Sequence, residues 1–79
     1  MKELEQFAIR LKDLRMEKGL SLMQLADEIG VSYVAISRWE NRLRIPSIES
    51  LVLLTKYFSV SPNYLLGYED YWFCKNIII

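Results

Sequence analysis

The chain has 79 residues and carries ten Lys and Arg, ten Asp and Glu and no His, so its formal net charge is zero. This length fits one small domain, and a hydrophobic fraction of 52% is too high for a disordered segment. Apolar runs such as Leu51–Leu54 fall far short of the roughly 20 residues that span a bilayer, and the acidic amino terminus lacks the pattern of a secretory signal. We therefore expect a cytoplasmic protein without a membrane anchor.

The composition also limits the kinds of metal site and active site that the chain can contain. Without His, a zinc site or a His-based catalytic triad would need partners that the chain lacks, and the single cysteine, Cys74, cannot form an internal disulfide. The carboxylates are scattered rather than gathered into an acid–base arrangement. We expect neither an enzyme nor a cofactor.

A helix is predicted over the amino-terminal part of the chain. Apolar residues recur with helical spacing at Leu4, Phe7, Ala8, Leu11 and Leu14. This pattern predicts one buried face and a helix that runs to about Lys18. Gly19 supplies the left-handed residue that closes such a helix, and Leu20 behind it can fold back as the hydrophobic contact of the cap.

Two short helices are predicted next, around a turn that contains Gly. Ser21 and Gln24 form the S-x-x-Q capping box that begins the first of them, and Gly30 ends it, where we expect a backbone that a side chain would obstruct. Ser32 is the N-cap candidate of the other, which ends near Glu40. The residues predicted to face inward are Leu22, Leu25, Ala26, Ile29, Val31, Ile36 and Trp39.

Two more helices complete the predicted core. Ser47 caps one of them after the polar loop 41–46, and Ser61 followed by Pro62 begins a single turn that Gly67 ends. The first of the two is predicted to place a broad apolar face at the centre of the domain, made of Ile48, Leu51, Val52, Leu54 and Phe58. The fold class is therefore all-α, with five helices between residues 4 and 66.

The last twelve residues change character. Residues 68–79 are rich in aromatic and β-branched types, which are costly to leave in water. We expect this tail to make a dimer contact, for example as a strand paired with its partner copy, and the alternative is that it wraps back over the first and fifth helices. The side chains concerned are Tyr71, Trp72, Phe73, Ile77, Ile78 and Ile79.

The pair of short helices from Ser21 to Glu40 points to a function. The small side chain of Ala26 lets two helices cross closely, and in a helix-turn-helix the second helix then places its amino-terminal residues in the major groove of DNA. The alternative interpretation is an ordinary small helical bundle, which also joins short helices with Gly.

Four stretches of the chain decide between these interpretations. They are Leu20-Ser21-x-x-x-Leu25-Ala26-x-x-Ile29-Gly30-Val31-Ser32, Ile36-Ser37-Arg38-Trp39-Glu40-Asn41, Pro46-Ser47 and Ser61-Pro62-Asn63-Tyr64-Leu65-Leu66-Gly67. In unbroken order they closely resemble the Cro and phage-repressor, or Xre-type, family of helix-turn-helix domains. The resemblance implies a five-helix, lambda-repressor-like DNA-binding domain over residues 1–67, with the helix-turn-helix at 21–40 and a tail at 68–79. It also implies a transcriptional repressor that binds a near-palindromic site on double-stranded DNA as a homodimer.

Carried over to this chain, the resemblance directs four side chains toward the groove. They are Tyr33, Val34, Ser37 and Arg38. Arg38 can donate two hydrogen bonds to a guanine or bind a phosphate, Ser37 can pair with several base edges, and Val34 suits a thymine methyl. Tyr33 can stack or reach a phosphate. The alternatives are that Arg38 is a solvated surface arginine and that Val34 is simply tolerated on a helix surface.

Phosphate contacts are expected to position the domain. The helix amino termini at Ser21 and Ser32 offer backbone N–H groups, and Arg42 and Arg44 line the loop where the resembling family binds the DNA backbone. We count Ser32, Asn41, Arg42 and Arg44 among the DNA-binding residues.

Two positions depart from the family pattern. Leu22 stands where many relatives have a Gln that bonds a phosphate, so that bond is not available, and Gln24 is not an obvious replacement. Arg42 stands where many relatives have Gly, so a positive φ there would strain its backbone mildly.

Arg15 and Glu40 are expected to have a structural role. In the resembling family, the corresponding arginine of the first helix meets the glutamate that ends the third helix. We therefore expect a partly buried ion pair that ties the recognition helix to the body of the domain.

The zero net charge hides a local excess of positive charge. Between Val31 and Pro46 the chain has three arginines and one carboxylate, Glu40. If Glu40 pairs with Arg15, this stretch predicts weak non-specific affinity for DNA and a strong reliance on dimerisation. The alternative function is a protein-interaction module that uses the same fold to hold a protein partner, as an antitoxin holds its toxin.

Overall fold

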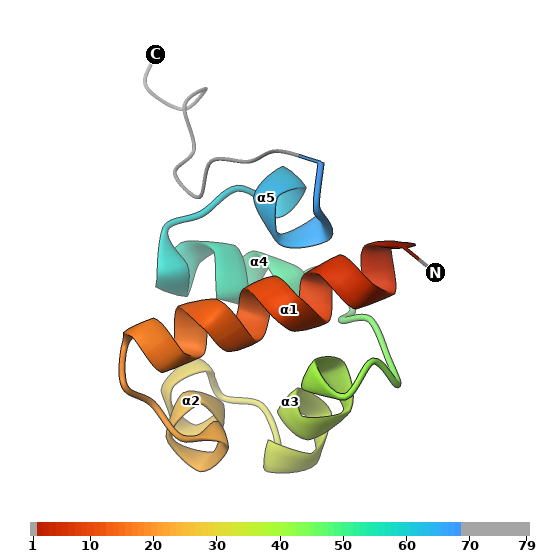
Figure 1. The fold of residues 1–79 in the computed structure, drawn as a ribbon. Helices are drawn as coiled ribbons and strands as arrows, with labels where there is room; N and C mark the ends of the chain where they lie inside the picture. The colour runs from red at the N-terminus through yellow and green to blue at the C-terminus, as the bar shows by residue number, and fades with distance from the viewer. Residues whose placement is uncertain (1, 69–79) are drawn as a thin grey trace.

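Figure 1 shows the computed structural model of the chain, which describes residues 2–68. These residues form α1 (Lys2–Glu17), α2 (Leu22–Ile29), α3 (Tyr33–Glu40), α4 (Ile48–Phe58) and α5 (Pro62–Leu66), and they contain no strand. The predicted all-α class with five helices is confirmed. The predicted dimer contact through Tyr71, Trp72, Phe73, Ile77, Ile78 and Ile79 lies outside the described residues.

The long helix α1 is the centre of the arrangement. In Figure 1, α2 and α3 lie below α1 and α5 lies above it, while α1 packs against both α3 and α5. Each helix places at least one side chain in the core. The largest fully buried side chains are Phe7, Leu11, Leu25, Ile36, Leu54 and Leu65.

The turn between α1 and α2 forms as the sequence predicts. Gly19 has φ 72°, and its N–H donates to the carbonyl of Met16, while the N–H of Leu20 donates to the carbonyl of Arg15. These two bonds and the packing of Leu20 against the core make a Schellman cap. The capping box is also confirmed, because Ser21 Oγ accepts from the N–H of Gln24 at 3.0 Å and Gln24 Oε1 accepts from the N–H of Ser21 at 2.8 Å.

The predicted buried face of α4 is partly wrong. Leu54 and Phe58 are buried and Leu51 is half-buried, but Ile48 is 80% exposed and Val52 is 42% exposed. Successive residues of a helix are turned by about 100°, so Ile48 and Val52 share a stripe that lies beside the Leu51, Leu54 and Phe58 stripe rather than on it. The neighbouring helices cover only one of these stripes.

The predicted need for glycine at position 30 is confirmed, and it comes from the backbone conformation of the turn rather than from a neighbouring atom. A Cβ built on Gly30 has no atom within 4 Å, so a side chain would not be obstructed there. Gly30 instead has φ 76°, in the left-handed region that side chains disfavour, and its N–H donates to the carbonyl of Ala26. The turn therefore requires glycine for its backbone conformation alone.

The end of α5 is held to the start of α1 by contacts that the sequence did not predict. The guanidinium of Arg10 donates to the carbonyl of Tyr64 at 3.2 Å and lies over the Tyr64 ring at 4.3 Å from its centre. The Tyr68 hydroxyl donates to Glu3, and this bond lowers the pKa of Glu3 and raises the pKa of Tyr68. Gly67 approaches so closely that a Cβ there would lie 2.6 Å from Cγ of Gln6.

Alanine substitutions separate the two demands on glycine. We expect Gly30→Ala to lower the free energy of unfolding by about 1–2 kcal/mol, because only the left-handed conformation is penalised. Gly67→Ala meets the same backbone penalty and in addition a collision with Gln6, which adds about 1–3 kcal/mol. Urea unfolding followed by circular dichroism measures both values, and equal losses would contradict the assignment.

Candidate nucleic-acid interface

The two faces of α3 have different surroundings. Ile36 and Trp39 are buried, and the Trp39 ring meets the Phe7 ring of α1 edge to face, with centroids 6.0 Å apart. The opposite face holds the four residues predicted to enter the groove. Tyr33, Val34 and Arg38 are exposed and Ser37 is half-buried. The structure therefore presents these four side chains along one outward stripe of α3.

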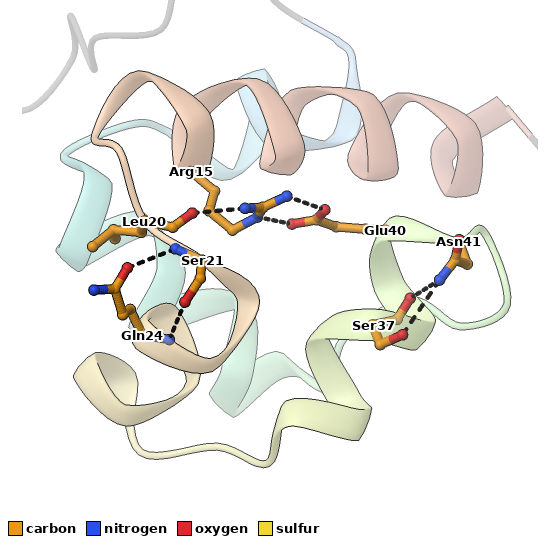
Figure 2. Close-up of polar contacts among 7 residues, drawn as sticks. All are labelled: Arg15, Leu20, Ser21, Gln24, Ser37, Glu40 and Asn41. Atoms are coloured by element: carbon orange, nitrogen blue, oxygen red, sulfur yellow. Dashed lines mark hydrogen bonds and ion pairs between the residues drawn. The ribbon is translucent and has the colours of Figure 1, made fainter.

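Arg15 joins three segments of the chain (Figure 2). Its Nε donates to Glu40 Oε2 at 2.7 Å and its Nη2 donates to Glu40 Oε1 at 3.0 Å, which makes a two-point ion pair. Its Nη1 donates to the carbonyl of Leu20 at 2.6 Å. The side chains of Arg15 and Glu40 are 12% and 7% exposed, and the bonds to Glu40 raise the pKa of Arg15. The guanidinium thus fixes the end of α3 against α1 and the turn before α2.

The Leu20 carbonyl is a partner of Arg15 that sequence reasoning missed. A backbone carbonyl leaves no signal in the residue pattern, because every residue has one. The Schellman cap at Gly19 turns the chain so that this carbonyl faces the guanidinium.

The amino termini of α2 and α3 are both capped by serine. Ser32 Oγ accepts from the N–H of Ala35 at 3.1 Å, and its side chain is exposed at the start of α3. At α2, the N–H groups of Ser21 and Gln24 are both used in the capping box. These two groups are therefore not free to bind a phosphate, although free N–H groups were predicted at this terminus. Gln24 Oε1 accepts from the Ser21 N–H in this cap. Gln24 is therefore already engaged and does not replace the phosphate-binding Gln that many relatives have at the position of Leu22.

The loop after α3 begins with a strained arginine. Arg42 has φ 62°, so the mild strain expected there is present. The N–H of Leu43 donates to the carbonyl of Arg38 at 2.9 Å, and the N–H of Arg42 donates to the carbonyl of Trp39 at 3.3 Å. This is a Schellman cap with arginine in the place that glycine usually takes. Arg42 and Arg44 are both exposed, beside the end of α3.

Asn41 has a contact that the sequence reasoning did not include (Figure 2). Its Nδ2 donates to the carbonyl of Ser37 at 2.8 Å and to Ser37 Oγ at 3.3 Å. The spacing of four residues along a helix was the available signal, because side chains at i and i+4 lie next to each other.

Exposed apolar side chains continue from this loop into α4. Leu43 is 70% exposed and Ile45 is 46% exposed, and the stripe of Ile48 and Val52 follows them. We call these four residues the apolar loop surface. Ile48 and Val52 were predicted to lie in the core, so this surface was not predicted from the sequence.

Two negative findings concern the described part of the chain. From residue 2 to residue 68, no helix has the length and apolar character needed to cross a membrane. The same residues contain no group of three or more His, Cys, Asp or Glu that could hold a metal ion.

Comparisons with known proteins agree with this arrangement. A family model described as helix-turn-helix matches residues 11–65. The chain is 42% identical over 65 residues to the HTH-type transcriptional activator BcrR of Enterococcus faecalis, which covers 82% of this chain and 32% of that protein. It is 39% identical over 57 residues to Repressor protein C2 of Salmonella phage P22, covering 72% of this chain and 26% of that protein. It is also 39% identical over 62 residues to the HTH-type transcriptional regulator SinR of Bacillus licheniformis, covering 77% and 56%.

The similarity is to one part of each relative. The chain spans between 26% and 56% of the length of the curated relatives that it matches. No solved structure matched the chain.

The two-point ion pair between Arg15 and Glu40 should contribute strongly to the free energy of unfolding. We expect Glu40→Gln to lower the free energy of unfolding by about 3 kcal/mol, because the Arg15 guanidinium would keep a charge that is mostly buried and no longer neutralised. Glu49→Gln, at an exposed glutamate of α4, is the matched control and should change the value by less than about 0.5 kcal/mol. Chemical denaturation measures both. Similar values for the two variants would show that the pair is not a structural support.

Proposed function

We propose that this chain, which belongs to the Cro and phage-repressor type of helix-turn-helix family, binds double-stranded DNA sequence-specifically and regulates transcription. The observation that carries the proposal is the outward stripe of α3, where Tyr33, Val34 and Arg38 are exposed while the opposite face is anchored in the core. An α-helix held in this way fits the major groove of B-form DNA.

Within this proposal, the residues divide into two kinds of contact. Arg38 and Val34 read base edges, Arg38 through two donors to guanine and Val34 through a thymine methyl, while Tyr33 stacks or reaches a phosphate. Ser32, Arg42 and Arg44 hold the DNA backbone on either side of the stripe. Glu40 is the one carboxylate between residues 31 and 46, and Arg15 neutralises it. Arg38, Arg42 and Arg44 therefore have no unpaired carboxylate within this stretch that would compete with DNA for their charge.

Repression is the mode of regulation that we propose. A domain that occupies an operator excludes other proteins from the same DNA without any further machinery. One matched relative is named a transcriptional activator and another a repressor, so the two names together support regulation and not its direction.

Salt dependence and base preference together test DNA binding. We expect the logarithm of the binding constant to fall with the logarithm of salt concentration, with a slope of about −0.9 for each phosphate neutralised. Arg38→Ala should relax the preference at one base pair by about 1–3 kcal/mol and leave other positions unchanged. Selection from a random duplex pool, followed by fluorescence anisotropy at several salt concentrations, measures both quantities.

Two further variants sharpen that experiment. Arg42→Gly should weaken binding equally for all sequences and reduce the salt slope by about one, while relief of the positive φ raises the free energy of unfolding by about 0.5–1 kcal/mol. Lys56→Ala, on the exposed side of α4, should change neither the slope nor the preference. Wild-type protein that shows no slope and no base preference would favour the protein-interaction module instead.

We also propose that two copies bind one near-palindromic operator, with half-sites one helical turn or roughly 34 Å apart. The few arginines of the interface support this, because a single copy neutralises few phosphates and gains affinity from a second linked contact. The tail at 68–79 remains the proposed contact. The apolar loop surface offers a second location in the described residues, because it adjoins the loop that carries Arg42 and Arg44.

Sedimentation of the full chain and two variants tests the dimer. Truncation after Gly67 should convert the dimer to a monomer, and an unchanged association state would contradict the tail contact. Ile48→Lys tests the apolar loop surface in the same way. Met16→Lys is the matched control, because Met16 is a 59% exposed apolar residue on α1 and its change should leave the association state as it is.

A further inference from the structure

The apolar loop surface brings four exposed hydrophobic side chains into one short stretch of the chain. Leu43 is 70% exposed and Ile48 is 80% exposed, and Ile45 and Val52 are exposed near them in the sequence. None of the four belongs to the buried core or packs against it. Single exposed apolar residues are ordinary, whereas a group of them marks an interaction site. A partner that covers this surface is therefore expected.

This surface alone is too small to hold two copies together. Four side chains present on the order of a few hundred Å², whereas a stable interface takes about 800 Å² from each partner. Two such surfaces placed face to face would also bring Arg42 and Arg44 of both copies together, since these arginines are exposed in the same loop. Like charges that meet across an interface weaken it. A contact made of this surface only therefore lacks both area and favourable charge.

The tail has apolar side chains that need such a surface. A tail paired only with the tail of a second copy would be a two-stranded pair, which is marginally stable in water unless it packs on an apolar face. The tail also begins with two carboxylates, Glu69 and Asp70, so it does not repel Arg42 and Arg44 beside the apolar loop surface. The apolar side chains concerned are Tyr71, Trp72, Phe73, Ile77, Ile78 and Ile79.

The structure fixes the point from which the tail starts. The Tyr68 hydroxyl donates to Glu3, and Gly67 lies against the side chain of Gln6, so the chain leaves the domain beside the first turns of α1. Figure 1 shows the loop after α3 on the side of the molecule where α1 begins. The start of the tail and the apolar loop surface can therefore face the same neighbouring copy.

The tail is also long enough to reach that copy. At about 3.3 Å per residue, residues 69–79 span up to about 36 Å when extended, which is several times the 8–10 Å or so between packed helices. A tail docked on its own copy would cover the same side chains, but it would leave no contact for the second copy that binds the operator.

We propose that residues 69–79 of one copy dock on the apolar loop surface of a second copy, whose tail docks on the first copy in the same way. This rests on the proposed function, in which two copies bind one operator. A twofold arrangement makes the two contacts identical. Each copy then contributes both a tail and a surface, and the aromatic side chains of a tail bury about 150–250 Å² each. The combined area reaches that of a stable interface, which neither element reaches alone.

Two full-length variants, each defective in one element, test the exchange when they are mixed. Ile48→Lys places a charge in the apolar loop surface, and Trp72→Asp together with Phe73→Asp places charges in the tail. Each variant alone should be monomeric at concentrations where the wild-type protein is dimeric. An equal mixture should form heterodimers, because the tail variant keeps an intact surface and the surface variant keeps an intact tail. Sedimentation with one variant fluorescently labelled measures them. The heterodimer should bind at least about tenfold more weakly than the wild-type dimer, since one of two contacts is missing.

Three controls accompany the mixture. A chain that carries all three substitutions offers neither element and should associate with neither variant. Leu43→Lys changes another exposed residue of the same surface and should behave as Ile48→Lys does. Thermal unfolding of each variant reports separately on the fold, which the two surface substitutions should leave intact because both side chains are exposed.

Each other outcome overturns the exchange. If Ile48→Lys alone stays dimeric, the tails pair without this surface. A tail variant that stays dimeric alone shows that the tail is not needed. A mixture of two monomeric variants that forms no heterodimer shows that both elements act within one chain. Wild-type protein that is monomeric at every concentration overturns the two-copy proposal as well, whereas the salt slope and the base preference decide DNA binding independently.

Discussion

The guanidinium of Arg15 is the point on which the arrangement of this domain depends. It holds Glu40 at the end of α3 through two bonds and the Leu20 carbonyl before α2 through a third. A planar group with several donors in fixed directions can meet a carboxylate and a carbonyl at once, which a lysine cannot do with the same geometry. The Arg15 guanidinium therefore fixes α3 relative to α1 and α2 together with the buried packing of Ile36 and of Trp39 on Phe7.

The ion pair between Arg15 and Glu40 also affects the charge that the candidate nucleic-acid interface presents. Glu40 neutralises Arg15 inside the domain, so it does not attract the arginines that lie on the surface. A chain with zero net charge can thus present a locally positive edge without being basic overall. Under the proposed function, such a protein gains little from non-specific attraction to phosphates, which is why we propose that correctly directed contacts and a second copy supply its affinity.

Several apolar side chains of α4 and of the loop before it are exposed rather than buried in the core. Seven of the eleven residues of α4 are apolar or aromatic, yet a small domain has too few neighbours to cover a helix on every side. Leu54 and Phe58 enter the core, while Ile48 remains in solvent together with Leu43 of the preceding loop. The exposed apolar edge therefore lies next to the loop that carries Arg42 and Arg44.

Local signals in the sequence determined most of the fold. Capping serines and the glycines after α1 and α2 act within one turn of chain, so helix ends could be predicted from neighbouring residues. The helical period likewise predicted the buried faces of α1 and α3. These features depend on backbone hydrogen bonds and spacing, which are the same wherever the segment lies.

Tertiary structure decided the features that depend on which groups meet across the fold. Periodicity shows that α4 is apolar, but only the positions of the other helices determine that Ile48 is left uncovered. The third bond of Arg15 uses a carbonyl that no pattern distinguishes. The sequence by itself thus determined the helices and the family of the site, and the packed fold determined which donors and apolar side chains face outward, because exposure is a property of the whole assembly of helices.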